Sequence, residues 1–258
     1  VQVDLASEFR YRSPIIGKQD LVVIISQSGE TADSLAALRL AKSMGVTTLA
    51  IVNVAGSSIA READHVILTY AGPEISVAST KAYSVQLAVL YLIAFLMAAA
   101  NGHLTPEETR ALVASLGSVP DVVRGVFSRQ TAIERAAEGF EGSTDLFFLG
   151  RGLDWALACE GSLKLKEISY IHCEACAAGE LKHGTISLIT DGIPVIALCT
   201  QDQLIPKMLS NIKEVKARGA VVTLIAKEGE SVSQDVADTL LLLDAMDDMF
   251  MPFAAVTV

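Results

Sequence analysis

The stretch that decides the fold is the apolar run Leu21-Val-Val-Ile-Ile25, which leads directly into the polar run Ser26-Gln-Ser-Gly-Glu-Thr31. A short run of β-branched residues that ends at a turn signal predicts a buried strand. The residues after it follow a helical pattern that stops at Gly45. Further along, two more strands are predicted, at 48–52 and 63–68. Strands that alternate with helices indicate crossover units and a parallel sheet.

This pattern returns later in the chain at one constant spacing, the separation between Ser26 and Thr200. At the same spacing Gly45 coincides with Gly219 and Asp64 with Asp238, so the two copies align without a gap. We therefore predict an α/β protein made of two repeated, doubly wound parallel-sheet lobes of the flavodoxin-like kind. The predicted lobes are residues 1–138, which include connecting helices from residue 105 onward, and residues 139–258.

The repeat also indicates parts that one copy has and the other lacks. The second lobe opens with a strand at 145–149 and a helix around 155–168, whose counterparts in the first lobe would precede Val1. The counterpart of the apolar stretch 82–100 would begin at Val256 and continue beyond the last residue. We expect that the first lobe lacks its opening strand and helix, that the second lacks its closing helix, and that the sequence is a piece of a longer one.

Composition excludes several classes of protein. The chain is 51% hydrophobic and only 19% charged. Such a composition indicates a large buried core. A formal net charge of −10 argues against a nucleic-acid-binding surface, which must attract phosphate backbones. Four cysteines and no signal-peptide pattern fit a reducing compartment, so we expect a cytoplasmic protein.

The stretch Ala82 to Ala100 is nearly uncharged and about the length of a membrane span. It contains Ser84 and Gln86, and no second span accompanies it. We interpret it as a buried core helix or a dimer-interface helix and expect no membrane insertion, because helices that are covered on all sides are apolar all round.

The loop Ser26 to Thr31 lies where the carboxyl end of a parallel strand meets a helix N-terminus, the usual ligand position in such sheets. Its hydroxyls and backbone N–H groups can hold a phosphate without a lysine, although they could instead only cap the helix. The matching loop of the second lobe, Thr200 to Gln203, has Asp202 at the place of Ser28. Because a carboxylate repels phosphate, we expect an anion site in the first lobe alone.

Lys164 and Glu167 are three residues apart on a predicted helix, so they share one face. A carboxylate beside an ammonium group can transfer protons, although a surface salt bridge is the commoner reason for such a pair. His183 lies in a loop bounded by Gly179 and Gly184. A single histidine in a loop is more often solvated than catalytic.

Cys173 and Cys176 have the spacing of a zinc half-site. A second pair of ligands at a suitable spacing is absent from the sequence. We therefore predict no metal site and interpret these cysteines as small buried side chains.

Several segments together resemble a known family. They include Ala6–Arg12, Ser26–Asp33, Glu74–Lys81, Lys164–His172 and Gly179–Gly184. Over essentially the whole chain they are similar to the isomerase (SIS) domain of glucosamine-6-phosphate synthase, also called glutamine–fructose-6-phosphate aminotransferase.

The resemblance implies an amino-sugar biosynthetic enzyme that works as a homodimer and needs no cofactor or metal. Its substrate would be fructose 6-phosphate, isomerised by an enediol-type proton transfer and aminated with ammonia from an upstream glutaminase domain. By the same resemblance Ser26, Gln27, Ser28 and Thr31 would hold the phosphate, and Val77 and Ser79 would line the sugar. Glu167 would move the proton between C1 and C2 with Lys164 beside it, and His183, supplied to the neighbouring subunit, would assist ring opening.

Two features of the family have no counterpart in this sequence. One is a Gly-Thr-Ser turn on the opening strand of the first lobe, and the other is a lysine near the C-terminus that forms a Schiff base with the ketose. We therefore expect the isolated chain to make no glucosamine 6-phosphate from glutamine and to isomerise weakly at best. Two alternatives stay open: a sugar-phosphate-sensing regulator that only binds its ligand, and a plain isomerase or deglycase without a glutaminase partner.

Overall fold

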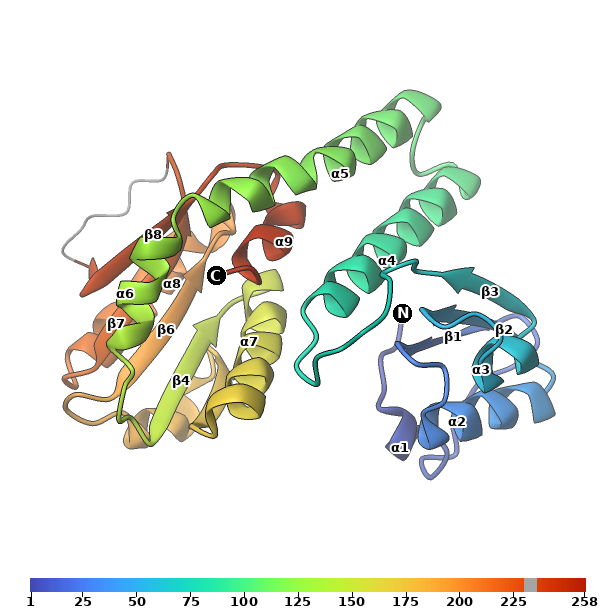
Figure 1. Cartoon of the computed structure of the whole chain (residues 1–258), viewed down its shortest axis with the longest axis horizontal. Helices are drawn as coiled ribbons and strands as arrows, with labels where there is room; N and C mark the ends of the chain where they lie inside the picture. Colours follow the sequence, from blue (N-terminus) through green and yellow to red (C-terminus); the bar gives the residue numbers. More distant parts are fainter. Residues whose placement is uncertain (230–235) are drawn as a thin grey trace. The chain divides into compact units, whose positions relative to one another are not determined.

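A computed structural model describes residues 1–229 and 236–258 (Figure 1). Its internal contacts divide the chain into two compact units, Val1–Thr109 and Arg110–Val258. Each unit contains one parallel sheet, and the two sheets correspond to the two predicted lobes.

The first unit is built on three parallel strands in the order β1-β2-β3. The helix α2 and the short α3 lie on one face of this sheet, where Ile24 and Val52 of the strands pack against Leu38 and Ile59 of the helices. Ile25 points to the opposite face and is 41% exposed. The elements of this unit are α1 (Ala6–Phe9), β1 (Leu21–Ser26), α2 (Ala32–Ser43), β2 (Thr47–Val52), α3 (Ser58–Glu62), β3 (His65–Leu68) and α4 (Lys81–Ala100).

The helix α4 is apolar all round but has only Ala82 and Phe95 buried, while Leu96 is 65% exposed. The prediction of a buried core helix is therefore wrong for this chain by itself, and a role at an interface stays a prediction. By length and composition alone, α4 could span a membrane, and the bent pair α5 (Pro106–Phe127) and α6 (Gln130–Glu138) passes the same test when taken as one segment.

The second unit is built on five parallel strands in the order β5-β4-β6-β7-β8. Its helices and strands are α5 (Pro106–Phe127), which begins at the boundary, α6 (Gln130–Glu138), β4 (Asp145–Gly150), α7 (Leu153–Ser169), β5 (His172–Ala177), β6 (Pro194–Cys199), α8 (Ile205–Lys216), β7 (Val221–Lys227), β8 (Thr239–Leu243) and α9 (Met251–Ala255). Short 3₁₀ turns span Leu181–His183, Thr185–Leu188, Asp202–Leu204 and Asp248–Phe250.

Both faces of this second sheet are covered, which confirms the doubly wound arrangement. Side chains alternate along each strand, so Phe147 and Leu149 face α8, whereas Leu146 and Phe148 face α7 and the helices beside it. Near-continuous apolar strands such as Leu146–Leu149 are what two covered faces require.

Both lobes contain the same hydrogen-bonded aspartate, which supports the predicted repeat. In the first, Asp64 accepts hydrogen bonds from the backbone N–H of Thr48 at 2.9 Å and from Lys42 at 2.8 Å. In the second, Asp238 accepts them from the Val222 N–H at 2.7 Å and from Lys216 at 2.6 Å. Each aspartate connects the end of a helix to the two strands that follow it. Each of the three residues has its counterpart in the other lobe at the predicted spacing.

The first strand of each repeat does not obey that spacing. Leu21 pairs with Thr47, but Val195, which the repeat places at Leu21, pairs with Val222 and not with Val221. The buried helix residues Ala41 and Val215 still obey the spacing, so the second lobe has one residue more between its paired strand and its helix interior. The loops themselves, 27–31 and 200–204, are equally long because α8 begins one residue earlier than the spacing predicts. The prediction of an alignment without a gap is wrong here. Asp202 still corresponds to Ser28 when positions are counted back from the matched buried helix residues Ala41 and Val215.

The boundary between the units also differs from the predicted one at Glu138/Gly139. Val122 and Val126 of α5 and Ile133 and Ala136 of α6 pack against the second sheet. Burying one such aliphatic side chain stabilises a fold by roughly 1.5–3 kcal/mol, so a row of them decides which lobe these helices join. They belong to the second unit, and the first ends at Thr109.

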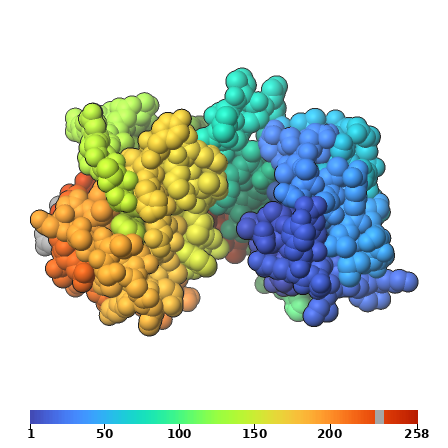
Figure 2. Space-filling model, turned by 90° about the horizontal axis from the view of Figure 1, so that it is seen from below, coloured from blue at the N-terminus to red at the C-terminus, as the bar shows by residue number. Residues whose placement is uncertain are grey.

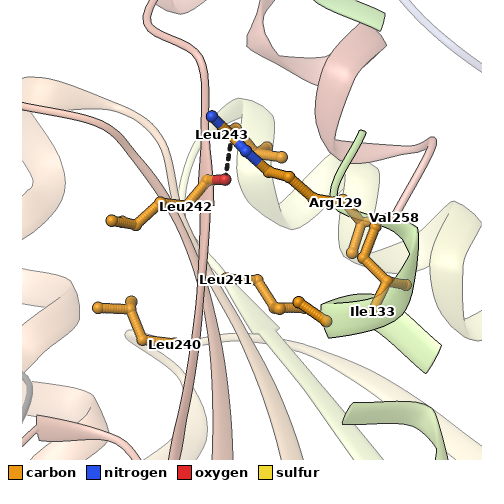
Figure 3. A pocket seen from close by; sticks show the side chains of 8 residues that line it. Arg129, Ile133, Leu240, Leu241, Leu242, Leu243 and Val258 are labelled. Carbon is orange, nitrogen blue, oxygen red and sulfur yellow. Dashed lines mark hydrogen bonds between the residues drawn. The ribbon is translucent and has the colours of Figure 1, made fainter. Parts of the chain in front are cut away.

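An apolar pocket of about 170 Å³ lies between α6 and the edge strand β8 (Figure 3). Among its lining residues, all in the described part of the chain, only Arg129 has a charged side chain. That guanidinium donates to the carbonyl of Leu242 and pairs with Glu228 and Asp244. The pocket lies beside the edge strand of the sheet, and none of the predicted site residues lines it.

Candidate functional site

The predicted phosphate loop connects the carboxyl end of β1 to the N-terminus of α2, as expected. The hydroxyl of Ser26 lies 3.0 Å from that of Thr31 and accepts the N–H of Gly29 at 3.1 Å. The Ser28 hydroxyl accepts the N–H of Glu30 at 3.2 Å. Thr31 is the N-cap residue of α2, but its side chain does not cap the helix. The first turn of α2 therefore keeps its partial positive charge for an anion, and the hydroxyls lie around that position.

Gly29 gives the loop its tight turn. Its φ is +67°, and a Cβ at this position would lie 2.0 Å from the Oγ of Ser57 and 2.6 Å from its Cβ. Ser57 is buried, and its hydroxyl has no hydrogen-bond partner among the described residues. The loop and the segment before α3 are thus in direct contact, and only glycine fits between them.

We expect Gly29→Ala to distort this loop and to weaken phosphate binding at least tenfold, because both the backbone conformation and the contact with Ser57 are lost. Gly56→Ala is the matched control, since its φ is +75° but nothing lies within 4 Å of an added Cβ. Titration calorimetry with inorganic phosphate checks the difference. Equal losses in the two variants would mean that backbone strain alone, and not the close contact, shapes the loop.

The loop contains one carboxylate, that of Glu30, and this group is hydrogen-bonded to the start of α3. Glu30 accepts the backbone N–H of Ser58, at the start of α3, at 2.7 Å. Hydrogen bonds from Ser58 lower the pKa of Glu30, so it is ionised at neutral pH and its charge is held at that helix end.

The corresponding loop of the second lobe is filled by the protein's own carboxylates. Asp154 is buried and accepts the backbone N–H of Thr200 at 2.8 Å and its hydroxyl at 2.6 Å. Asp248 accepts the N–H of Asp202 at 2.8 Å. These groups take the donors that a phosphate would need, which supports the prediction that only the first lobe offers an anion site.

Two residues predicted to line the sugar lie in the segment between β3 and α4. Val77 is 94% exposed, and Ser79 is half-buried. The hydroxyl of Ser79 donates to the carboxylate of Glu74, which also accepts the N–H groups of Ile75 and Ser76 at 2.9 and 3.0 Å. Ser79 is therefore fixed in orientation, whereas Val77 is placed at the surface.

In the second lobe, the helix α7 carries the predicted proton-transfer pair. It begins directly behind Gly150, where a Cβ would lie 2.4 Å from the carbonyl oxygen of Asp154, so glycine allows α7 to start close against β4. This helix lies at the surface of its unit, where it is coloured yellow in Figure 2. The ammonium group of Lys164 donates to Glu167 at 2.8 Å, as its spacing predicted.

A third charged residue, Glu160, joins this pair and was not predicted. Its carboxylate lies 3.8 Å from the ammonium group of Lys164. Burial raises the pKa of Glu160, against the opposing effect of Lys164. Its position four residues before Lys164 was a usable signal, because residues four apart on a helix are neighbours. The three side chains form a compact acid–base cluster of one ammonium and two carboxyl groups.

His183 ends the 3₁₀ turn after β5 and is exposed. Cys173 and Cys176 are buried, as predicted, and burial raises the pKa of Cys176 to about 11, so its thiol is protonated at neutral pH. Among the described residues no group of three or more histidine, cysteine or acidic side chains could hold a metal ion.

Comparisons with known proteins show the family of this chain. A protein-family model described as SIS domain matches residues 1–96 and 140–258. The glutamine–fructose-6-phosphate aminotransferase (isomerizing) of Symbiobacterium thermophilum is 52% identical over 99% of this chain, and that of Methanosarcina acetivorans is 46% identical. The chain spans only about two fifths of the length of these curated relatives, 42% and 41%.

One solved structure is similar along nearly the whole chain. It is the C-terminal domain of glucosamine-fructose-6-phosphate aminotransferase from Francisella tularensis, with a TM-score of 0.95 and 41% identity. The match covers 99% of this chain and 73% of that one.

Proposed function

We propose that this chain, which belongs to the SIS domain family, is the isomerase part of a glutamine–fructose-6-phosphate aminotransferase. Its substrate is fructose 6-phosphate, and its product in the intact protein is glucosamine 6-phosphate. The observation that carries the proposal is the presence of both an open phosphate-type loop in the first lobe and the Lys164–Glu167 pair in the second, within a chain so similar to these enzymes.

Ser26, Gln27, Ser28 and Thr31 bind the phosphate group, supported by the loop geometry and the uncapped start of α2. Val77 and Ser79 lie along the sugar. Ser79 donates its own hydrogen to Glu74 and accepts the N–H of Ala82 at 3.2 Å, so one lone pair of its oxygen is left to accept a hydrogen bond from a sugar hydroxyl.

Glu167 is the base. After ring opening, ammonia adds to the C2 carbonyl and water leaves, so that C2 carries an imine. The carboxylate of Glu167 removes a proton from C1, the two electrons of that C–H bond form the C1–C2 double bond, and the electron pair of the C=N double bond moves to the nitrogen to give an enol with an amino group at C2. The protonated Glu167 then returns the proton to C2, which takes it up with the electrons of the C1–C2 double bond. The hydroxyl on C1 loses its proton as its O–H electrons form the C1=O double bond, and an aldose with an amino group at C2 results. Lys164 holds Glu167 in place through its hydrogen bond, as a positioned base requires.

His183 assists ring opening and reaches the active site of a neighbouring subunit in a homodimer. Support for a dimer comes from the exposed position of His183 and from α4, whose apolar surface this chain leaves largely uncovered. We also propose a cytoplasmic location, supported by four cysteines that form no disulfide bond in the described part of the chain.

Ammonia comes from a glutaminase domain upstream of this chain. The curated relatives are more than twice as long as the chain and are named for a glutamine-dependent reaction. No cofactor or metal takes part in the proposed proton transfer, which needs a positioned carboxylate only.

The test is to purify the protein that contains this chain and to supply fructose 6-phosphate with glutamine, with an ammonium salt, or with neither. We expect glucosamine 6-phosphate with glutamine and hexose-phosphate interconversion without a nitrogen source. Binding without any turnover would favour a sugar-phosphate-sensing regulator, and isomerisation without amination a plain isomerase. The mass of the protein in solution tests the dimer.

A further inference from the structure

We infer that Asn53 is a positioning residue for sugar recognition, because it holds the segment that leads to Ser79 in a fixed place beside the phosphate loop. The inference rests on the proposed function for the identity of the ligand. Asn53 directly follows β2, the central strand of the first sheet, so it stands between the loops that follow β1 and β3.

Its backbone and its side chain contact different loops. The N–H of Asn53 donates to the carbonyl of Gln27 in the phosphate loop at 3.0 Å. Its side-chain amide donates to the carbonyl of Gly72 at 2.8 Å, and its side-chain oxygen accepts the N–H of Ala71 at 2.8 Å and the hydroxyl of Thr69 at 3.1 Å. A single residue therefore connects the phosphate loop to the segment after β3.

That segment is organised further along by a second group. Glu74 gathers the N–H groups of Ile75 and Ser76 and the hydroxyl of Ser79, and these hydrogen bonds lower its pKa. Asn53 fixes the start of the segment and Glu74 shapes its end. The distance between the phosphate loop and the Ser79 hydroxyl is thereby set, as a ligand with a phosphate at one end and hydroxyls along its length requires.

The second lobe supports this role for the position. At the spacing of the repeat, Lys227 corresponds to Asn53 and Asp248 to Glu74. The ammonium group of Lys227 contacts Asp248 at 2.6 Å and also pairs with Asp202 of the loop after β6. The residue at this position of each repeat, Asn53 or Lys227, therefore joins the neighbouring loops in both lobes. In the second lobe it does so by ion pairs, which occupy the loop after β6.

Asn53 connects the same loops in the first lobe without a charge. Its hydrogen bonds are directed to the segment after β3, so Ser28 and Thr31 are left to a ligand. A purely structural role would make Asn53 equally important for every ligand of the loop. A positioning role predicts that its loss weakens the contacts with the sugar and spares those with the phosphate.

The experiment compares two ligands, inorganic phosphate and fructose 6-phosphate, by titration calorimetry with Asn53→Ala and Asn53→Asp in the protein that contains this chain. Asn53→Ala removes all three side-chain hydrogen bonds to the segment, whereas Asn53→Asp removes only the one donated to Gly72. We therefore expect fructose 6-phosphate to bind about tenfold more weakly to Asn53→Ala and less than tenfold more weakly to Asn53→Asp, with phosphate bound within about twofold of its original affinity. Asn101→Ala is the matched control, because in the described part of the chain the side chain of this asparagine bonds only to Met97, at the end of α4. Equal losses for both ligands, or no loss for either, would overturn the inference.

Amide hydrogen exchange provides a readout that does not depend on the ligand. In Asn53→Ala the amides of residues 69–72 are expected to exchange faster, with those of residues 29–31 unchanged. If exchange is faster in the variant but the unsubstituted protein binds no sugar phosphate, the proposed function is wrong and the positioning role stands. If exchange is unchanged, the positioning role is wrong. If Asn53→Ala does not fold, Thr69→Val, which removes one of the three side-chain hydrogen bonds, is expected to show the same selective weakening to a smaller degree.

Discussion

Replacing Glu167 by glutamine is expected to slow hexose-phosphate isomerisation by about 10²–10⁴-fold and to leave the affinity for fructose 6-phosphate within about tenfold. A carboxamide has the shape of the carboxylate and can still accept the hydrogen bond from Lys164, but it cannot take a proton from C1. The ion pair that it replaces is partly exposed, because the side chain of Glu167 is 30% exposed. The fold should therefore lose little stability.

Incorporation of solvent deuterium at C1 and C2, followed by NMR, measures the proton transfer directly. The matched control is Glu134→Gln, since Glu134 on α6 contacts only Gln130 among the hydrogen bonds of the described residues. Exchange that continues at its original rate in whatever substrate still binds would show that Glu167 is a salt-bridge partner and no base.

Replacing Ser28 by aspartate is expected to weaken fructose 6-phosphate binding by about 10²–10³-fold. Two unit charges 4 Å apart repel by about 4 kcal/mol at an effective dielectric constant of 20, and partial exposure of the loop reduces this. The substitution reproduces in the first lobe the carboxylate that Asp202 contributes to the second.

The neutral variant Ser28→Asn controls for shape and for the lost hydroxyl, and it should cost no more than about tenfold. The difference between the two variants should shrink as salt is added, because mobile ions screen the repulsion. Equal losses at low salt, or a difference that salt does not change, would contradict an anion site at this loop.

Much of the fold could be predicted because its signals are local. The run Leu21–Ile25, the helical pattern that ends at Gly45 and their return in the second lobe each depend on neighbouring residues, and each is present in the structure. The ion pair of Lys164 and Glu167 follows from their spacing on one helix.

The errors arise where distant segments compete. The amphipathic helices α5 and α6 could have covered either sheet, and only the packing of residues such as Val126 and Ala136 shows which one they cover. The extra residue of the second lobe is visible only in the pairing of β6 with β7, because both strands are largely apolar and neither pattern fixes the register.

The same reason explains the missed residues of the site. Asn53 looks like an ordinary turn residue in the sequence, and its role depends on hydrogen bonds to residues 16 to 19 positions away. The environment of Glu160 depends on which face of α7 is buried, which a helix of mixed composition does not reveal.

The central claim is that the loop Ser26–Thr31 holds the phosphate of the substrate. The most direct measurement is a crystal structure of the protein that contains this chain with fructose 6-phosphate bound. We expect phosphate oxygens about 3 Å from the hydroxyls of Ser26, Ser28 and Thr31. A phosphate bound instead at the Thr200–Gln203 loop would contradict the account.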